Sequence, residues 1–151
     1  MTFVSKYYRL WLSIWIAFVF VQSLFFKFTG SSETQYIFAV LGEWLGMSWF
    51  AYYGAYIVGT MELIAAIALF TRWQAWAALL AFEIMSGAIV FHLFTPLGIV
   101  MPAFSASGEM VGNDGGALFF MACITWASAT GLVVADVLSP HSRLRFKNKG
   151  Q

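Results

Sequence analysis

The stretch that decides the fold of this chain is residues 75–94, which read AWAALLAFEIMSGAIVFHLF. A helix of this length, at a rise of about 1.5 Å per residue, covers the roughly 30 Å hydrocarbon layer of a bilayer. Only Glu83 and His92 can ionise within it, and Pro96, which cannot continue a helix, follows it. These features predict a membrane-spanning helix.

Three other apolar stretches have similar length and character, at residues 8–26, 50–70 and 115–137. The composition agrees with them, because 61% of the residues are hydrophobic and only 10% are charged, whereas soluble domains carry about 25% charged residues. A length of 151 residues suits one domain. We therefore predict an all-α membrane protein, a bundle of four transmembrane helices that forms a single domain over residues 1–151.

Residues 32–46 are too short and too polar to span a bilayer. Ser32 and Gln35 fit a capping box, which indicates that a helix starts there. The apolar residues have the spacing of one helix face, and they are Tyr36, Ile37, Val40, Leu41, Trp44 and Leu45. We predict an amphipathic helix that lies in the membrane interface or dips into it, with Thr34 and Glu43 on its polar face.

The basic residues predict the orientation of the four spans. Seven of the eight fall on one side of the membrane if all four stretches cross it, and only Lys27 falls on the other. The seven are Lys6, Arg9, Arg72, Arg143, Arg145, Lys147 and Lys149. Because basic residues gather on the cytoplasmic side, we expect both termini, with the basic tail 139–151, in the cytoplasm. The expected location is a bacterial-type inner membrane, and the loop at residues 97–113 faces outward.

Glu62 and Glu83 are acidic residues within predicted spans, and ionisable groups at membrane depth are candidate functional sites. Each lies about 13 Å from the cytoplasmic side by helix rise, on helices joined by a tight turn. Two carboxyl groups close together in a low dielectric do not both ionise easily. We predict that they share a proton and can take part in proton transfer. The alternative is a pair of protonated glutamates that fixes helix packing through hydrogen bonds to each other or to Ser86.

Lys27 and His92 are expected near the outer interface. His92 follows Glu83 by nine residues, which is about two and a half helical turns. The two side chains therefore lie on opposite faces of the helix and cannot both point at one cluster. His92 can instead join Lys27 and the acidic residues of the outer segments, which makes it a candidate cofactor ligand. The alternatives are a lysine that reaches to the interface and a histidine that is simply hydrated.

The sequence predicts neither a metal site nor an intrinsic cofactor. One histidine within the spans cannot supply both axial ligands of a bis-histidine haem, and no cluster of cysteine and histidine suits zinc. The single cysteine, Cys123, rules out an internal disulfide and a dithiol relay within this chain. The many aromatic side chains could stack against a quinone ring, although belt and packing roles are their default.

Three short motifs resemble the DoxX family of small four-helix membrane proteins, over roughly residues 10–136. They are Phe25-Phe26-Lys27-Phe28-Thr29-Gly30, Gly59-Thr60-Met61-Glu62-Leu63 and Ala68-Leu69-Phe70-Thr71-Arg72. Phe70 stands where the family often has glycine. The resemblance implies similarity to membrane subunits of thiosulfate:quinone oxidoreductases and of other redox or thiol-stress complexes, and it marks Lys27 and Glu62 as functional positions.

Three hypotheses for the function follow. The first is a membrane subunit of a sulfur-, thiol- or quinone-linked redox complex, in which a partner provides the redox centre. Its partners would be the bilayer, other protein subunits and a soluble redox protein, with no nucleic acid. The second is a structural or assembly subunit without chemistry of its own. The third is a small proton-coupled exporter, which is disfavoured because such exporters carry their glutamate in the first helix, where this chain has none.

Overall fold

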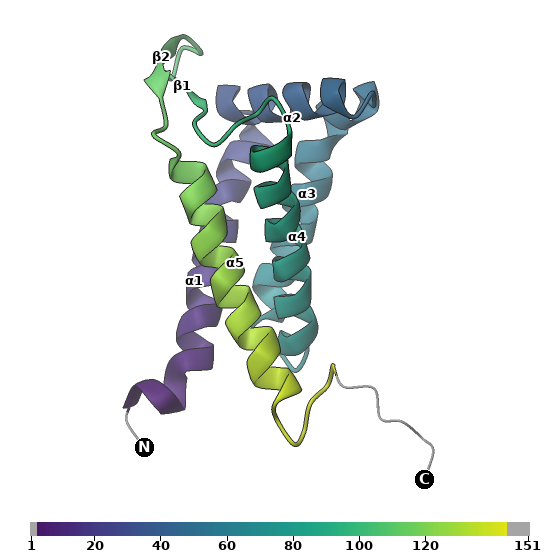
Figure 1. The fold of residues 1–151 in the computed structure, drawn as a ribbon, viewed down its shortest axis with the longest axis vertical. Helices are drawn as coiled ribbons and strands as arrows, with labels where there is room; N and C mark the ends of the chain where they lie inside the picture. Colours follow the sequence, from purple (N-terminus) through teal and green to yellow (C-terminus); the bar gives the residue numbers. More distant parts are fainter. Residues whose placement is uncertain (1–2, 145–151) are drawn as a thin grey trace.

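The computed structural model describes residues 3–144, and the side chains of residues 7–144. Four of its helices are long and apolar enough to cross a membrane, as the sequence predicts. The elements, in chain order, are α1 (Phe3–Thr29), α2 (Ser32–Trp44), α3 (Ser48–Ala68), α4 (Gln74–Phe94), β1 (Pro102–Phe104), β2 (Met110–Asn113) and α5 (Ala117–Val137). The chain therefore has the architecture of a multi-pass membrane protein (Figure 1).

The long helices form a four-helix bundle in which neighbours follow the ring order α1, α3, α4, α5 and back to α1. The start of α1, the α3–α4 turn and the end of α5 lie at one end, which we call the terminal end (Figure 1). The short helix α2 and the β1–β2 pair lie at the other, which we call the hairpin end. The predicted adjacency of the second and third spans is confirmed, since α3 packs on α4.

The predicted all-α class is confirmed in that the structure is mostly helical, and the hairpin end adds one short pair of strands. Strands β1 and β2 pair as an antiparallel hairpin inside the segment predicted to be a loop, with an irregularity between Ala103 and Phe104. The turn between them is closed by the N–H of Gly108, which donates to the carbonyl of Ser105 at 2.9 Å and has a φ of +82°. A long connection needs partners for its backbone polar groups, and strand pairing supplies them here.

Helix α2 lies across the hairpin end, over the end of α1 and against α3 (Figure 1). The short amphipathic helix is therefore confirmed, but its expected faces are partly wrong. Leu41 is buried as predicted, whereas Thr34 is also buried and Trp44 is half exposed. Thr34 can be buried because the hydroxyl of Ser31 hydrogen-bonds both its side chain and its backbone N–H. Ser31 is thus the residue that caps this helix.

Small residues allow α2 and α1 to approach α3 closely, as they commonly do between membrane helices. A Cβ on Gly42 would lie 2.8 Å from the Cβ of Ala51, and one on Gly54 would lie 2.6 Å from the ring of Phe38. A Cβ on Gly59 would lie 2.9 Å from the ring of Phe28. The small residues Ala55, Gly59 and Ala66 of α3 are all buried.

The interior of the terminal half is a packed apolar core. Its fully buried members include Ile16 and Phe20 of α1, Leu69 just after α3, and Ala78 and Ala81 of α4. Alanines on α4 leave room for the larger side chains of α1, so that the core fills without bulky residues on every helix. This core closes the bundle below the polar residues described next.

Basic side chains hold the terminal end together. Arg9 donates a hydrogen bond to the carbonyl of Ala135, and Arg143 donates to the carbonyl of Arg72. The carboxylate of Asp136 accepts hydrogen bonds from the hydroxyl of Ser142 and from the backbone N–H groups of Arg143 and Leu144. The remaining residues of the predicted basic cluster, Arg145, Lys147 and Lys149, lie outside the described residues, as does the side chain of Lys6.

Replacing Gly42 with alanine should destabilise the protein, because the added Cβ would meet the Cβ of Ala51 and its backbone nitrogen at 2.8 and 2.9 Å. Overpacking of this kind costs about 1–3 kcal/mol. Thermal unfolding in detergent measures the effect. The matched control is Gly87→Ala, where a Cβ meets nothing within 4 Å. Equal melting temperatures for the two variants would contradict the close approach of α2 and α3.

Candidate functional site: a buried ion pair beside two cavities

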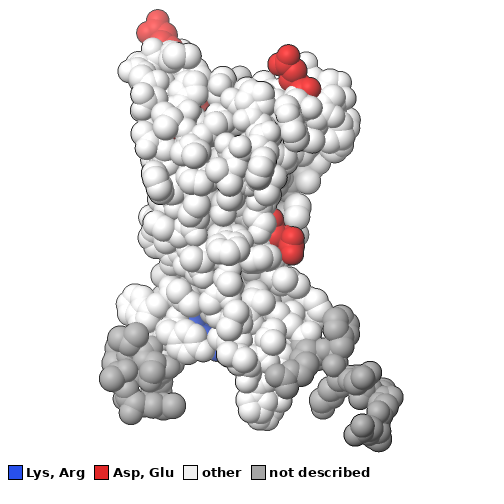
Figure 2. All heavy atoms as spheres, viewed as in Figure 1, with Lys and Arg blue, Asp and Glu red and all other residues white. Residues whose placement is uncertain are grey.

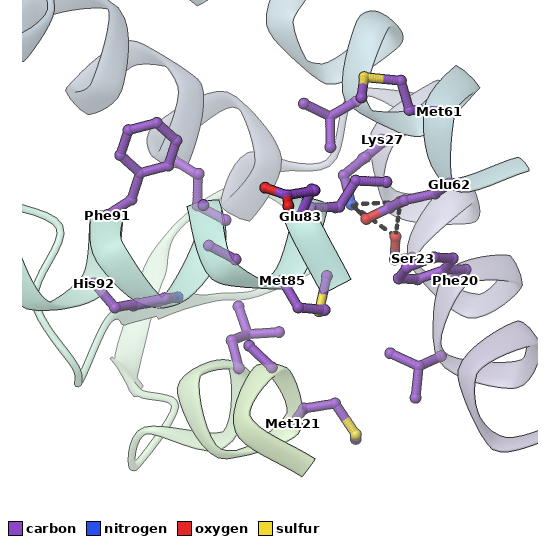
Figure 3. A pocket seen from close by; sticks show the side chains of 18 of the residues that line it. Phe20, Ser23, Lys27, Met61, Glu62, Glu83, Met85, Phe91, His92 and Met121 are labelled. Carbon is purple, nitrogen blue, oxygen red and sulfur yellow. Dashed lines mark hydrogen bonds and ion pairs between the residues drawn. The ribbon is translucent and has the colours of Figure 1, made fainter. Parts of the chain in front are cut away.

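Lys27, Ser23 and Glu62 form a hydrogen-bonded group, which we call the ion-pair cluster. The Nζ of Lys27 lies 3.0 Å from Oε2 of Glu62 and donates to its Oε1 at 3.1 Å. The same Nζ donates to Oγ of Ser23 at 2.6 Å, and this hydroxyl donates to Oε2 of Glu62 at 2.6 Å. The side chains of Lys27 and Glu62 are 16% and 3% exposed. Each charge thus has its partner inside the bundle (Figure 3).

The helices explain why these residues meet. Ser23 and Lys27 are four residues apart on α1, so they share a face. Helix α1 ends beneath α2, whereas α3 continues beside α2, and this offset sets the last turns of α1 level with the middle of α3 (Figure 1). The stacking of Phe28 on Tyr56, with ring centroids 6.2 Å apart, is a second contact between α1 and α3, nearer the hairpin end. Lys27 therefore turns into the bundle toward Glu62, which disfavours the alternative of a lysine that only reaches to the interface.

The predicted carboxyl pair of Glu62 and Glu83 is replaced by the pairing of Glu62 with Lys27. Glu83 is exposed, and no hydrogen bond or ion pair joins it to another described residue. In Figure 3 no dashed line connects it to the cluster. The predicted contact of a glutamate with Ser86 is also absent from the described residues, since Ser86 bonds the carbonyl of Phe82 and the indole N–H of Trp126. A cation neutralises a buried carboxylate better than a second carboxylate can.

A cavity of about 370 Å³ lies beside the ion-pair cluster, and we call it the central cavity (Figure 3). Helices α1, α3, α4 and α5 wall it, and Ile37 and Phe38 of α2 roof it. Its lining is mainly apolar, and its polar and ionisable side chains are Ser23, Lys27, Glu62, Glu83 and His92. All four site candidates from the sequence therefore border one space, although only Lys27 and Glu62 touch each other.

The central cavity has an exposed side between α3 and α4. Met61 and Glu83, which both line it, are exposed at the surface of the bundle. A Cβ on Gly87, also in its wall, would meet no atom within 4 Å. Figure 2 shows acidic side chains at the hairpin end and at mid-height, basic atoms toward the terminal end, and an uncharged surface over most of the rest of this face.

His92 is buried at the hairpin-end edge of the central cavity, where its ring packs edge-on against Phe119. Its Nδ1 lies 2.6 Å from the carbonyl oxygen of Gly98, which makes that nitrogen the donor and leaves Nε2 as the free ring nitrogen. The backbone carbonyl thereby fixes the ring orientation. The alternative of a histidine that is simply hydrated at the interface is therefore wrong, because His92 is buried.

Asp114 ties the segment before β1 to the start of α5. Its carboxylate accepts the N–H groups of Met101, Gly116 and Leu118 at 2.8, 2.9 and 3.3 Å. Burial raises the pKa of Asp114, but these three hydrogen bonds and the nearby His92 outweigh burial and hold the pKa below its usual value. Asp114 therefore gives a fixed negative charge at the hairpin end.

A second cavity, of about 330 Å³, lies between the ion-pair cluster and the hairpin end, and we call it the hairpin-end cavity. Its polar lining consists of Ser23, Lys27, Glu33, Thr34 and Asp114. Glu33 also accepts the N–H of Phe104 at 3.2 Å, so it joins α2 to β1. No local pattern in the sequence indicates this cavity, because its walls come from α1, α2, β1 and α5.

Comparisons of the chain with protein-family models, with curated proteins and with solved structures found no match.

Removing one partner of the ion pair should cost more than removing both. Glu62→Leu and Lys27→Met each leave an unpaired group in an apolar interior, which costs about 3–5 kcal/mol. The double variant replaces the pair with apolar side chains and should recover most of that loss. Thermal unfolding in detergent of the four proteins gives the double-mutant cycle. Glu83→Gln is the control and should change little, because Glu83 bonds no described residue. Additive losses would contradict a direct Lys27–Glu62 interaction.

Proposed function

We propose that this protein is a membrane subunit of a redox complex, in which it holds a quinone-like, lipid-soluble molecule in the central cavity. The observation that carries the proposal is an apolar cavity in the bundle whose wall contains a charged hydrogen-bond donor, Lys27. Its volume of about 370 Å³ falls within the roughly 300–1,000 Å³ of small-molecule sites.

The chemistry of the cavity suits a flat ring with carbonyl oxygens. Phe20 and Phe91 offer aromatic surface, and Met61, Met85 and Met121 offer side chains that adapt to the shape of a ligand. A lysine ammonium has three N–H donors, of which Ser23 and Glu62 take two. The third is available for a carbonyl oxygen of the ligand, and the free Nε2 of His92 is a second polar contact in the same space.

The exposed side of the cavity suits a molecule that arrives through the lipid. The walls at Met61, Glu83 and Gly87 open between α3 and α4, halfway along the spans. A ligand with an isoprenoid tail can place its ring inside while the tail remains among lipid chains. This geometry favours a lipid-soluble ligand over a soluble substrate.

A partner must supply the redox centre in this proposal. The resemblance of the Lys27 and Glu62 motifs to the DoxX family supports a membrane subunit of a sulfur-, thiol- or quinone-linked complex. The second candidate is a structural subunit, and one observation favours it: Glu62 already has its partners within the chain. The two functions differ in whether the central cavity must stay open for activity.

The charges of the described residues support an orientation with the terminal end in the cytoplasm of an inner membrane. Arg9, Arg72 and Arg143 lie at the terminal end, whereas Glu33, Glu43, Glu109 and Asp114 belong to the segments at the hairpin end. This arrangement follows the tendency of basic residues to stay on the cytoplasmic side.

A bulky side chain at Gly87 should weaken ligand binding. Gly87→Leu fills the central cavity from a position where a Cβ has free space, so folding should be preserved. The affinity for a short-chain ubiquinone analogue should fall at least about tenfold, or 1.4 kcal/mol. Quenching of tryptophan fluorescence on titration with that analogue measures the Kd. Ala127→Leu, at an exposed α5 position away from the cavity, should bind like the parent. Absence of saturable binding to the parent protein would reject the quinone proposal.

Reporter fusions test the orientation. A reporter that is active only in the cytoplasm should be active when fused after Gln151 and silent when inserted near Ser107, in the exposed turn between β1 and β2. The physical reason is the basic terminal end. The reverse pattern would overturn the orientation and leave the cavity proposal untouched.

A further inference from the structure

The two cavities share a wall that contains the ion-pair cluster. Ser23 and Lys27 line both of them, together with Ile37, Phe38 and Leu118. The cluster therefore stands between two mainly apolar spaces, of which the one near the hairpin end has the larger share of polar residues in its lining. Lys27 and Ser23 each border the central cavity on one side and the hairpin-end cavity on the other.

The hairpin-end cavity has room and polar partners for water, although most of its lining is apolar. A buried water needs two to four polar partners, and this cavity offers the side chains of Ser23, Lys27, Glu33, Thr34 and Asp114. Its volume of about 330 Å³ holds several water molecules, since a cavity needs roughly 10–15 Å³ to hold one. Its walls come from elements at the hairpin end, so the solvent at that end is the nearest source of water.

The opposite side of the ion-pair cluster is closed. Between the cluster and the terminal end lie Ile16 and Phe20, both 0% exposed, and Leu69, which is 1% exposed. Ala78 and Ala81 of α4 complete this packed layer. Water that reaches Ser23 and Lys27 thus comes from the hairpin end and not from the terminal end.

We infer that the hairpin-end cavity is a water-filled passage that connects the ion-pair cluster with the solvent on the hairpin side alone. Water and small ions then reach Lys27 and Ser23 from that side. Two carboxylates, Glu33 and Asp114, line the passage together with Lys27, whose charge is already paired with Glu62. The net charge of the lining is therefore negative, and a negative lining concentrates cations. The passage should therefore favour cations over anions.

This inference adds sidedness to the proposed site, and its test requires no ligand. In a Cys123→Ser background, which removes the only cysteine, a single cysteine is introduced by Ser23→Cys or, as a second variant, by Ile37→Cys in the shared wall. Vesicles of known sidedness are treated with membrane-impermeant methanethiosulfonates, one cationic and one anionic. Ser107→Cys, in an exposed turn, identifies the hairpin side.

Both wall cysteines should react from the hairpin side only, and the cationic reagent should react about tenfold faster than the anionic one. Glu33→Gln should reduce that preference. Ala81→Cys, in the packed core, should not react from either side. Protection of both wall cysteines while Ser107→Cys reacts, or equal reaction from both sides, would overturn the passage. Quinone binding that fails while this labelling succeeds would reject the ligand proposal alone.

Discussion

The ion pair between Lys27 and Glu62 is the constraint on which the rest of the site depends. An unpaired charge at membrane depth is costly, and here a cation of α1 and an anion of α3 satisfy each other at 3.0 Å, with Ser23 completing the hydrogen bonds. The pair fixes the height of α1 against α3. A shift by one helical turn, about 5.4 Å, would break these contacts and leave two charges in an apolar interior.

The height of α1 also determines the form of the hairpin end. Because α1 ends below the level where α3 begins, α2 can cross over it, and Gly42 and Gly54 let α2 pack tightly on α3. The roof residues Ile37 and Phe38 then close the central cavity above Lys27. Glu33 and Asp114 connect this roof, the hairpin and α5 through hydrogen bonds to backbone N–H groups. The cavities thus result from the way in which short and long helices are offset.

The terminal half differs in its physical character. Alanines of α4 and large apolar side chains of α1 fill its interior, and backbone carbonyls at the helix ends accept hydrogen bonds from Arg9 and Arg143. The bundle is therefore asymmetric along its axis, with a packed core toward the terminal end and two cavities toward the hairpin end. This asymmetry, rather than any single residue, is the basis for a site that is accessible from one end only.

Length, apolar content and the rarity of ionisable residues are local properties. They were enough to predict the four spans, a short helix over residues 32–46 and the candidates Lys27, Glu62, Glu83 and His92. Which of these candidates meet depends on the packing of the helices. Equal depth along adjacent helices suggested a pairing of Glu62 with Glu83, but depth does not specify the direction in which a side chain points. The offset of α1, the burial of Thr34 and the β1–β2 hairpin arise from contacts between distant segments. Those contacts give Glu62 its lysine and leave Glu83 at the open side of the cavity.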